Sequence, residues 1–441
     1  MKKNSLFIFE FISGGGFNKV NIPSSLFCEG FGMLRAIISD FKEIDFEIST
    51  ILDYRASFLS KFIQADLIRI VNAEDNYLIL FKEALEECSY CFIIAPESSN
   101  TLYNLSKLVK KSNKELLSAS LKSINQSTSK IDAFKFFKKN KILTPRTYII
   151  PSTESELDID FILQKFKKLN CPIIIKPVDG VGAESIYYFE RENEILNFFR
   201  DFNEYLALDR DYILQEFIHG RDLSLSLLGC PHVSKSRISN PIILSINTQD
   251  VNINNKGNIS EYLGGTTPVE NIEELIEKIE IILKTVEFTG FYGYFGIDFI
   301  STEKASFSFI EINPRLTTSY LGVRNVINYN CAELIIQSKM NEFEPVDIEF
   351  LNFSQFSRII LFSEKGYPTY RLNERNLSKL MKEIPELVTP PISFNKSNQY
   401  SCLIATKTAD SHSSKKRIDE IFLKFEKMNF RVVRSLQTGL K

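Results

Sequence analysis

Residues 292–315 read YGYFGIDFISTEKASFSFIEINPR, and this stretch decides the fold that we predict. The segments 292–300 and 306–313 are rich in aromatic and β-branched residues, and the short polar segment STEKA separates them. We therefore predict two antiparallel strands joined as a hairpin. The simplest turn is centred between Lys304 and Ala305, and this position fixes which residues of the two strands face each other.

Three oxygen-bearing side chains converge on one face of this predicted hairpin. Asp298 is expected opposite Glu311, and the strand period of two places Asn313 on the same face. Two facing carboxylates repel each other and are costly to bury, and a divalent cation relieves that cost. Mg²⁺ binds a few protein oxygens together with substrate phosphates, and Arg315, after the strand-ending Pro314, supplies a forked positive charge for phosphate or carboxylate. An exposed sheet face with an ordinary salt bridge is the alternative interpretation.

A second candidate site follows the apolar segment PIIIK, which ends at Lys176. The next loop contains Gly180 and Gly182. A lysine at a strand end beside such a loop can pair with phosphates while the backbone N–H groups of the loop cover them. The loop is not of the Walker A type, because no Gly-Lys-Ser/Thr follows it, and a surface turn is the alternative.

A third candidate is YILQEFIHGRD, residues 212–222. Its strand ends in polar residues, bends at Gly220 and continues as a strictly alternating segment, as a half-buried strand should. Such a segment can offer backbone groups to the edge of an adenine and the Asp222 carboxylate to ribose hydroxyls. A plain strand–turn–strand is the alternative.

The rest of the chain predicts an α/β protein. Strands alternate with helices in the first 125 residues, which favours a small doubly wound parallel sheet, and strands dominate beyond residue 221. We predict early strands at 5–10, 47–52 and 91–96, with helices at 24–40, 76–88 and 99–112. Later strands are expected at 147–150, 171–177, 185–190, 212–217, 222–228, 241–249, 356–363 and 400–407, and later helices at 132–140, 156–168, 191–205, 271–288 and 413–428.

Composition narrows the function further. The 441 residues include 53 Lys+Arg and 55 Asp+Glu, and the formal net charge of −2 gives no reason to expect nucleic acid or a membrane surface as a partner. No apolar run approaches a membrane span, and the N-terminal segment fits a first strand better than a signal peptide, so we expect the cytoplasm. Cys88 and Cys91 lack the second C-x-x-C pair of a zinc ribbon and are expected to be buried free thiols.

These motifs occur in the order and spacing of the ATP-grasp superfamily, which the chain resembles over residues 120–335. Within it the chain is similar to the tyramine–glutamate ligases of methanofuran biosynthesis and their relatives. The segments that carry the closer resemblance are SGGGF, SSLFCEGFGML, IAPES, KPVDG, YILQEFIHG and EINPRLTTSYLG.

The resemblance implies a fold in four parts. We expect an N-terminal Rossmann-like pre-ATP-grasp domain at 1–125 and a small ATP-covering subdomain at 126–220. A large antiparallel-sheet subdomain with the metal and catalytic residues is expected at 221–345, and a C-terminal extension packed on it at 346–441.

It also implies roles for individual residues. Arg315 and Lys176 are the expected catalytic residues, and Asp298, Glu311 and Asn313 the expected ligands of Mg²⁺, or of Mn²⁺ in its place. Relatives carry an acid before their first lysine, whereas Ser129 precedes Lys130 here. The expected ATP-binding residues are Lys130, Lys176, Asp179, Gly180, Gly182, Ala183, Gln215, Glu216, Phe217, Ile218 and Asp222. The expected substrate contacts are Gly15, Glu29, Asn247, Gln249 and Thr317.

The reaction implied is ATP-dependent amide formation from a small-molecule carboxylate and an amine. An acyl phosphate is the expected intermediate, glutamate with a primary amine such as tyramine is the favoured pair, and the resemblance allows a homodimer. Two alternatives stay open. One is a biotin-carboxylase-like carboxylase, although the Met-Lys-Met biotinylation sequence is absent, and the other is a nucleotide-binding protein without catalysis.

Overall fold

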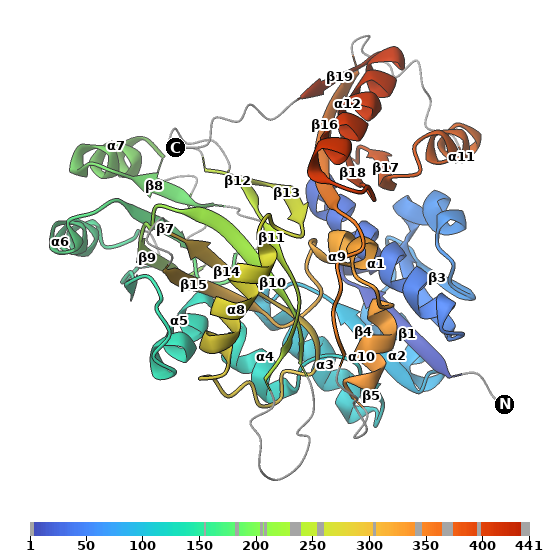
Figure 1. Ribbon diagram of the computed structural model, residues 1–441, viewed down its shortest axis with the longest axis horizontal. Coiled ribbons are helices and arrows are strands. Elements are labelled where there is room, and N and C mark those ends of the chain that lie inside the picture. Colours follow the sequence, from blue (N-terminus) through green and yellow to red (C-terminus); the bar gives the residue numbers. More distant parts are fainter. Residues whose placement is uncertain are drawn as a thin grey trace.

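The computed structural model describes residues 4–153, 156–180, 185–202, 206, 210–229, 240–253, 260–302, 306–339, 346–363, 374–394 and 398–433. Over these residues the strands form four sheets, and the helices pack on and between them (Figure 1). None of the helices in this described part is long and apolar enough to cross a membrane.

The N-terminal sheet is parallel throughout and has the strand order β3-β2-β1-β4-β5. This confirms the doubly wound sheet that the alternation of strands and helices predicts. The strands are β1 (Ser5–Glu10), β2 (Glu47–Asp53), β3 (Leu67–Val71), β4 (Tyr90–Ile94) and β5 (Glu115–Leu116). The helices are α1 (Ser24–Glu43), α2 (Tyr77–Glu86) and α3 (Thr101–Lys111), with the short helical turns η1 (Ile12–Gly16), η2 (Tyr54–Phe62) and η3 (Ser98–Asn100).

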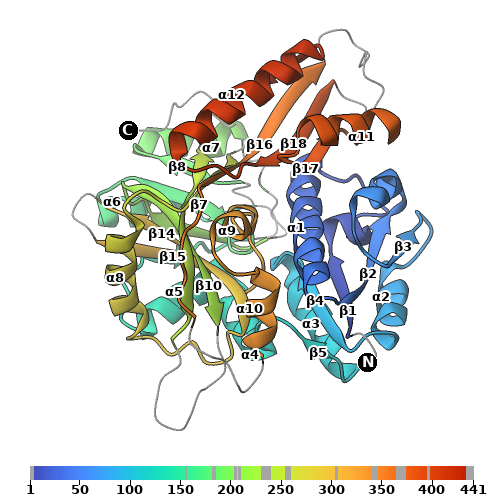
Figure 2. The same cartoon turned by 45° about the vertical axis from the view of Figure 1, so that its right-hand side comes forward.

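Strand β1 is buried on both faces, which explains its continuous apolar sequence. Leu6 and Ile8 pack in the core that contains the apolar residues of α1. Phe7 and Phe9 point to the opposite face and pack with α2 and α3. The helices therefore cover both faces of the sheet, and Figure 2 shows α1 on one side of it and α2 on the other.

A second, four-stranded sheet has the order β6-β9-β7-β8 and its own apolar core. It comprises β6 (Thr147–Ile149), β7 (Ile173–Pro177), β8 (Tyr187–Phe189) and β9 (Tyr212–Glu216), packed with α6 (Ile159–Leu169) and α7 (Glu192–Phe202). Helices α4 (Leu121–Ser127) and α5 (Lys130–Lys139) lead into it from the N-terminal unit.

The third sheet is antiparallel, in the order β11-β10-β14-β15, and contains the predicted hairpin. Its strands are β10 (Arg221–Gly229), β11 (Ile242–Thr248), β14 (Gly293–Ser301) and β15 (Phe307–Asn313), and α8 (Ile272–Leu283) covers one face. Asp298 pairs with Glu311 as predicted, but the register shifts between Asp298 and Phe299 because a β-bulge places one extra residue in β15.

The fourth sheet joins the C-terminal region to the middle of the chain. It has the order β12-β13-β16-β18-β17, with β19 beside β16. Its strands are β12 (Asp250–Asn252), β13 (Glu261–Thr267), β16 (Ser354–Ser363), β17 (Leu387–Ile392), β18 (Gln399–Ala405) and β19 (Phe430–Val433). The remaining helices are α9 (Tyr320–Val326), α10 (Cys331–Gln337), α11 (Glu374–Glu383) and α12 (Ser411–Lys427). Strand β13 pairs with β16, so this sheet spans the boundary predicted at residue 345. The division of the chain into four parts stays a prediction.

Candidate active site

The candidate site is a cavity of about 250 Å³ between the small sheet and the large sheet, closed on one side by the N-terminal unit. It brings together side chains from segments more than two hundred residues apart. The sequence-predicted residues that line it are Glu29, Lys130, Lys176, Asp179, Gly180, Gln215, Glu216, Phe217, Ile218, Asp222, Gln249, Asp298, Glu311, Asn313, Arg315 and Thr317.

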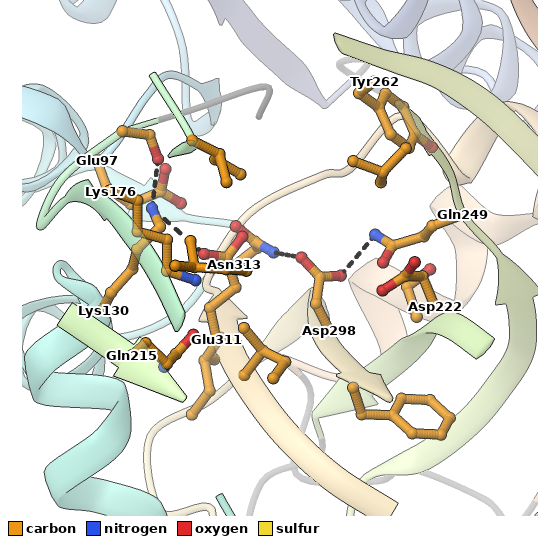
Figure 3. A pocket seen from close by; sticks show the side chains of 18 of the residues that line it. Glu97, Lys130, Lys176, Gln215, Asp222, Gln249, Tyr262, Asp298, Glu311 and Asn313 are labelled. Atoms are coloured by element: carbon orange, nitrogen blue, oxygen red, sulfur yellow. Dashed lines mark hydrogen bonds and ion pairs between the residues drawn. The ribbon is translucent and has the colours of Figure 1, made fainter. Parts of the chain in front are cut away.

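At the centre of the cavity two carboxylates face each other across the β14–β15 hairpin. Asp298 lies opposite Glu311, and its carboxylate accepts hydrogen bonds from Asn313 Nδ2 at 3.1 Å and from Gln249 Nε2 at 3.0 Å. Figure 3 shows Asp298 between these two amides. Gln249 was expected to contact substrate, and in this structure it orients Asp298.

The pKa values of these two carboxyl groups are shifted in opposite directions. Burial, and then the neighbouring Glu311, raise the pKa of Asp298 well above its usual range. Burial also acts to raise the pKa of Glu311, but Lys130 and Lys176 outweigh it and hold that pKa at about 2. Negative charge is therefore held more readily on Glu311 than on Asp298.

Two lysines surround Glu311. The Lys130 ammonium lies 3.3 Å from Glu311 Oε2 and donates to the Gly180 carbonyl at 2.6 Å. Lys176, at the end of β7, is 5 % exposed, and burial together with Lys130 lowers its pKa to about 8. An anionic ligand placed between the two ammonium groups relieves their repulsion, so this end of the cavity suits a phosphate chain.

The donor set at the hairpin fits magnesium. Two carboxylates and one amide supply the hard oxygens that Mg²⁺ takes from proteins, and substrate phosphates and water complete its shell. The pKa of Asp298 is raised because burial and the neighbouring Glu311 disfavour a second negative charge at this position. A divalent cation compensates that charge.

Arg315 reaches the cavity from the segment after β15 and is paired with a residue that sequence reasoning missed. Its Nη2 donates to Glu97 Oε2 at 3.0 Å, and its Nε lies 3.0 Å from Glu97 Oε1. Glu97 follows β4 in the N-terminal unit and is 7 % exposed. A lone acid just after a buried parallel strand was the available signal, since such strand ends form binding sites in α/β sheets.

The segment predicted to hold adenine lines the cavity beside β7. Gln215 is buried, and its amide nitrogen donates to Thr147 Oγ1 at 2.9 Å, whereas Glu216 pairs with Arg146 at 2.8 Å. Burial raises the pKa of Asp222 to about 6, although Lys176 acts against it. These contacts order the segment and leave its role toward a nucleotide as a prediction.

Several predicted residues have other surroundings. Asn247 is fully buried; its amide donates to Ser226 Oγ at 3.0 Å and its carbonyl oxygen accepts from Thr267 at 2.8 Å, so it links β10, β11 and β13 and does not line the cavity. Gly15 has φ of +98° and packs against Val71, away from the cavity. Thr317 lines the cavity while sharing hydrogen bonds with Tyr294 and Ser319. Gly182 and Ala183 lie outside the described residues.

The Asp179 carboxylate is already engaged. Arg210 donates to Asp179 Oδ1 at 2.8 Å, and the Ser99 N–H donates to Oδ2 at 3.3 Å. This residue therefore connects the end of β7 to the N-terminal unit. Cys88 and Cys91 are buried free thiols, as predicted.

Comparison with known proteins finds two matching domains and several relatives. Residues 127–319 match the ATP-grasp domain, and residues 46–124 match the pre ATP-grasp 3 domain. The tyramine–L-glutamate ligase of Methanocaldococcus fervens is 27 % identical over 79 % of this chain and 99 % of its own length. The same enzyme from Methanocaldococcus jannaschii is 28 % identical over 76 % of this chain and 90 % of its own.

A solved structure supports the same fold over nearly the whole chain. The biotin carboxylase of Campylobacter jejuni, crystallised as a complex with β,γ-ATP, superposes with a TM-score of 0.66 at 13 % identity, covering 97 % of this chain and 92 % of that one. At this identity the likeness speaks for the fold alone. The two domain matches identify a pre ATP-grasp domain at 46–124 and an ATP-grasp domain at 127–319, and the named relatives of the chain are carboxylate–amine ligases.

Proposed function

We propose that this protein binds Mg·ATP in the cavity around Asp298 and Glu311 and uses it to join a small carboxylic acid to an amine. The observation that carries the proposal is the charge arrangement there: two facing carboxylates, two ammonium groups and one guanidinium line a single cavity. An oxygen-ligated cation next to several fixed positive charges is the arrangement that phosphoryl transfer requires.

Each charged group has a place in this proposal. Lys130 and Lys176 bind the phosphate oxygens of ATP, and the segment from β9 to Asp222 accepts the adenosine. Asp298, Glu311 and Asn313 would hold Mg²⁺, which supplies positive charge to the β- and γ-phosphates when bound. The positive charge of the ion would offset the repulsion between the two facing carboxylates.

The reaction forms two bonds in turn between groups that the cavity holds next to each other. A carboxylate oxygen of the acid substrate attacks the γ-phosphorus, and ADP leaves with the electron pair of the broken P–O bond. Arg315 lies where negative charge develops on the transferred group and exchanges its contact with Glu97 for one with the acyl phosphate. The amine then attacks the acyl carbon, and phosphate leaves as the amide forms.

The favoured substrate pair is glutamate with a primary amine such as tyramine. Support for this pair comes from the two tyramine–L-glutamate ligases, because the chain spans nearly the whole length of both. At about 27 % identity the acid and the amine are open to test, since ligands of one fold change readily.

The experiment is a screen of ADP release in which acids are crossed with amines in the presence of Mg²⁺. We expect ADP formation that needs both an acid and an amine, with glutamate and aryl-ethyl amines among the active pairs. ADP formation with bicarbonate in place of an acid would instead favour a carboxylase. Tight Mg·ATP binding without ADP formation across the whole panel would favour a nucleotide-binding protein without catalysis.

A further inference from the structure

A second cavity, of about 990 Å³, adjoins the candidate active site. It lies where the segments after β1 and β4 meet, residues 10–17 and 94–101. The N-terminal sheet reverses its strand order between β1 and β4, and crevices at the carboxyl ends of strands at such a switch point are where open α/β sheets bind ligands. Glu29, Glu97 and Arg315 line both cavities, so the two connect beside the guanidinium.

Acidic side chains outnumber basic ones in the lining of this second cavity. Among its described lining residues six are acids and two are arginines, namely Glu10, Glu29, Glu97, Asp132, Asp179, Asp211, Arg210 and Arg315. Both arginines already face carboxylates, Arg315 at Glu97 and Arg210 at Asp179. The lining therefore offers carboxylates in excess and favours a cationic ligand over one that carries a carboxylate of its own.

Two of the acids are fixed in place. Glu10 ends β1, is 2 % exposed, and accepts from the backbone N–H groups of Ile12 at 2.9 Å and Ser13 at 2.6 Å. Glu29 projects from α1, and its Oε2 accepts from Thr318 Oγ1 at 2.8 Å. Glu10 packs directly against Gly30, where a Cβ would come within 2.5 Å of its carboxylate, so the glycine lets α1 approach the end of β1 closely, and Glu29 precedes this glycine in the chain.

Apolar side chains form another part of the cavity wall. Phe11, Phe17, Leu26, Met33 and Ile94 line it, and the rings of Phe11 and Phe17 meet edge to face at 5.9 Å. An aryl or alkyl group of a ligand finds aromatic and aliphatic contacts there, while its cationic end faces the carboxylates. The cavity thus offers both carboxylates and apolar contacts.

We propose that this second cavity binds the acceptor substrate, a primary amine with an apolar body and no carboxylate, with its ammonium at Glu29 and Glu10. The inference rests on the proposed ligase function and adds the place and the selectivity of the amine. Glu29 lines both cavities, so an ammonium held by it lies at the side of the second cavity that adjoins the candidate active site. Phe11, Phe17, Leu26 and Met33 then determine which amine body is accepted.

Amide formation at this site removes two protons from the ammonium and breaks the bond between the acyl carbon and phosphate. The ammonium loses one proton to Glu29, and the lone pair of the neutral amine forms the N–C bond at the acyl carbon. The bond from that carbon to the phosphoryl oxygen breaks, and phosphate leaves with the electron pair. The second proton of the nitrogen goes to phosphate, and Glu29 returns its proton to solvent.

The test compares two variants of the full chain. Glu29→Gln removes the charge at nearly constant shape, and Leu26→Trp fills the apolar part of the cavity. Glu83→Gln and Ile79→Trp on α2 are matched controls, because both positions are exposed on that helix. Initial rates of amide formation are measured against amine concentration with the best acid of the ADP screen, using phenethylamine and phenylalanine as acceptors.

We expect both cavity variants to raise the KM for phenethylamine at least tenfold, Glu29→Gln to lower kcat as well, and the controls to match wild type. We also expect wild type to prefer phenethylamine over phenylalanine by at least a hundredfold in kcat/KM. Unchanged amine KM in Glu29→Gln, or equal use of phenylalanine, would overturn the inference.

A separate assay keeps the two proposals apart. Hydroxylamine is small and needs no apolar wall, so wild type should convert the acid to its hydroxamate with ATP. Hydroxamate formation with unchanged amine KM in both cavity variants refutes only the amine site. No hydroxamate from any acid refutes the ligase function itself.

Discussion

At the scale of single residues, the site is built from charges that the fold forces together. Lys130 and Lys176 hold the pKa of Glu311 low, whereas burial and then the neighbouring Glu311 raise the pKa of Asp298. Sequence reasoning identified these residues because acids, lysines and an arginine at strand ends are conspicuous in apolar strands. It missed Glu97, whose partner Arg315 lies 218 positions away, since no local pattern encodes such a pair.

The role of Glu311 is tested by Glu311→Gln. The substitution keeps the shape but removes the charge that balances Lys130, so we expect turnover to fall by at least a hundredfold while the fold persists. ADP formation and the thermal midpoint measure the two effects. Glu280→Gln, at a surface ion pair with Lys284, is the control and should keep full activity. Near-normal turnover in Glu311→Gln would remove Glu311 from the metal site.

Glu10 makes stability depend on pH. Burial raises its pKa from 4.5 to about 7, so the folded chain binds this proton more tightly than the unfolded chain. The unfolded chain loses the proton first as pH rises, and stability therefore falls between about pH 4.5 and 7, by up to about 3 kcal/mol. Urea unfolding of wild type at pH 5.5 and 8 should show this loss.

The matched variants isolate the contribution of Glu10. Glu10→Gln cannot ionise, so its free energy of unfolding should change less between the two pH values, whatever its absolute stability. Glu83→Gln should change as wild type does. An unaltered pH difference in Glu10→Gln would mean that other groups cause it.

At the scale of elements, the hairpin was predictable and its bulge was not. Counting outward from a turn at 304–305 places Asp298 opposite Glu311, and the structure confirms the pair. Nearer the turn the pairing is shifted by one residue, because β15 carries the extra residue of the bulge. The edge strand β3 also escaped prediction, since Leu67–Val71 is only partly buried and includes Arg69, which weakens its apolar pattern.

The end of β7 is held to the N-terminal unit through Asp179, and this link is testable. Asp179→Asn weakens the pairing with Arg210, so we expect the end of β7 to be held less firmly to the N-terminal unit and water to reach the activated phosphate more often. Phosphate release with acid but without amine should rise at least threefold. Asp201→Asn, which loses an exposed pair with Arg200, should leave this rate unchanged. An unchanged rate in Asp179→Asn would refute the link's role in excluding water.

At the scale of the whole molecule, the ends of the chain share one core. Helix α1 packs between the N-terminal sheet and the C-terminal strands β17 and β18, as Figure 2 shows. Arg35 on α1 donates to the carbonyls of Leu387 and Val388 at 2.8 and 2.9 Å. Contacts across more than 350 residues leave no trace in local periodicity, which is why the strands and helix predicted within residues 346–441 came without any prediction of their contact with α1.

Because of this shared core we expect a single thermal unfolding transition. Asp40 strengthens the connection: it accepts from Arg324 Nε at 2.9 Å and from the Tyr320 hydroxyl, joining α1 to α9. Asp40→Asn leaves the guanidinium without its counter-charge and should lower the midpoint by several degrees while keeping one transition, as calorimetry can measure. Asp419→Asn, exposed on α12, should not shift it. Two separate transitions in wild type would contradict the shared core.

The proposed ligase reaction requires ATP to activate a carboxylate in front of Arg315, and the fate of the carboxylate oxygen reveals whether this step occurs. The acid substrate found in the ADP screen is labelled with ¹⁸O in its carboxylate, and the released phosphate is analysed by mass spectrometry after one round of amide formation. Attack of that carboxylate on the γ-phosphorus predicts one ¹⁸O atom in each phosphate. Phosphate without ¹⁸O, formed together with the amide, would contradict the account.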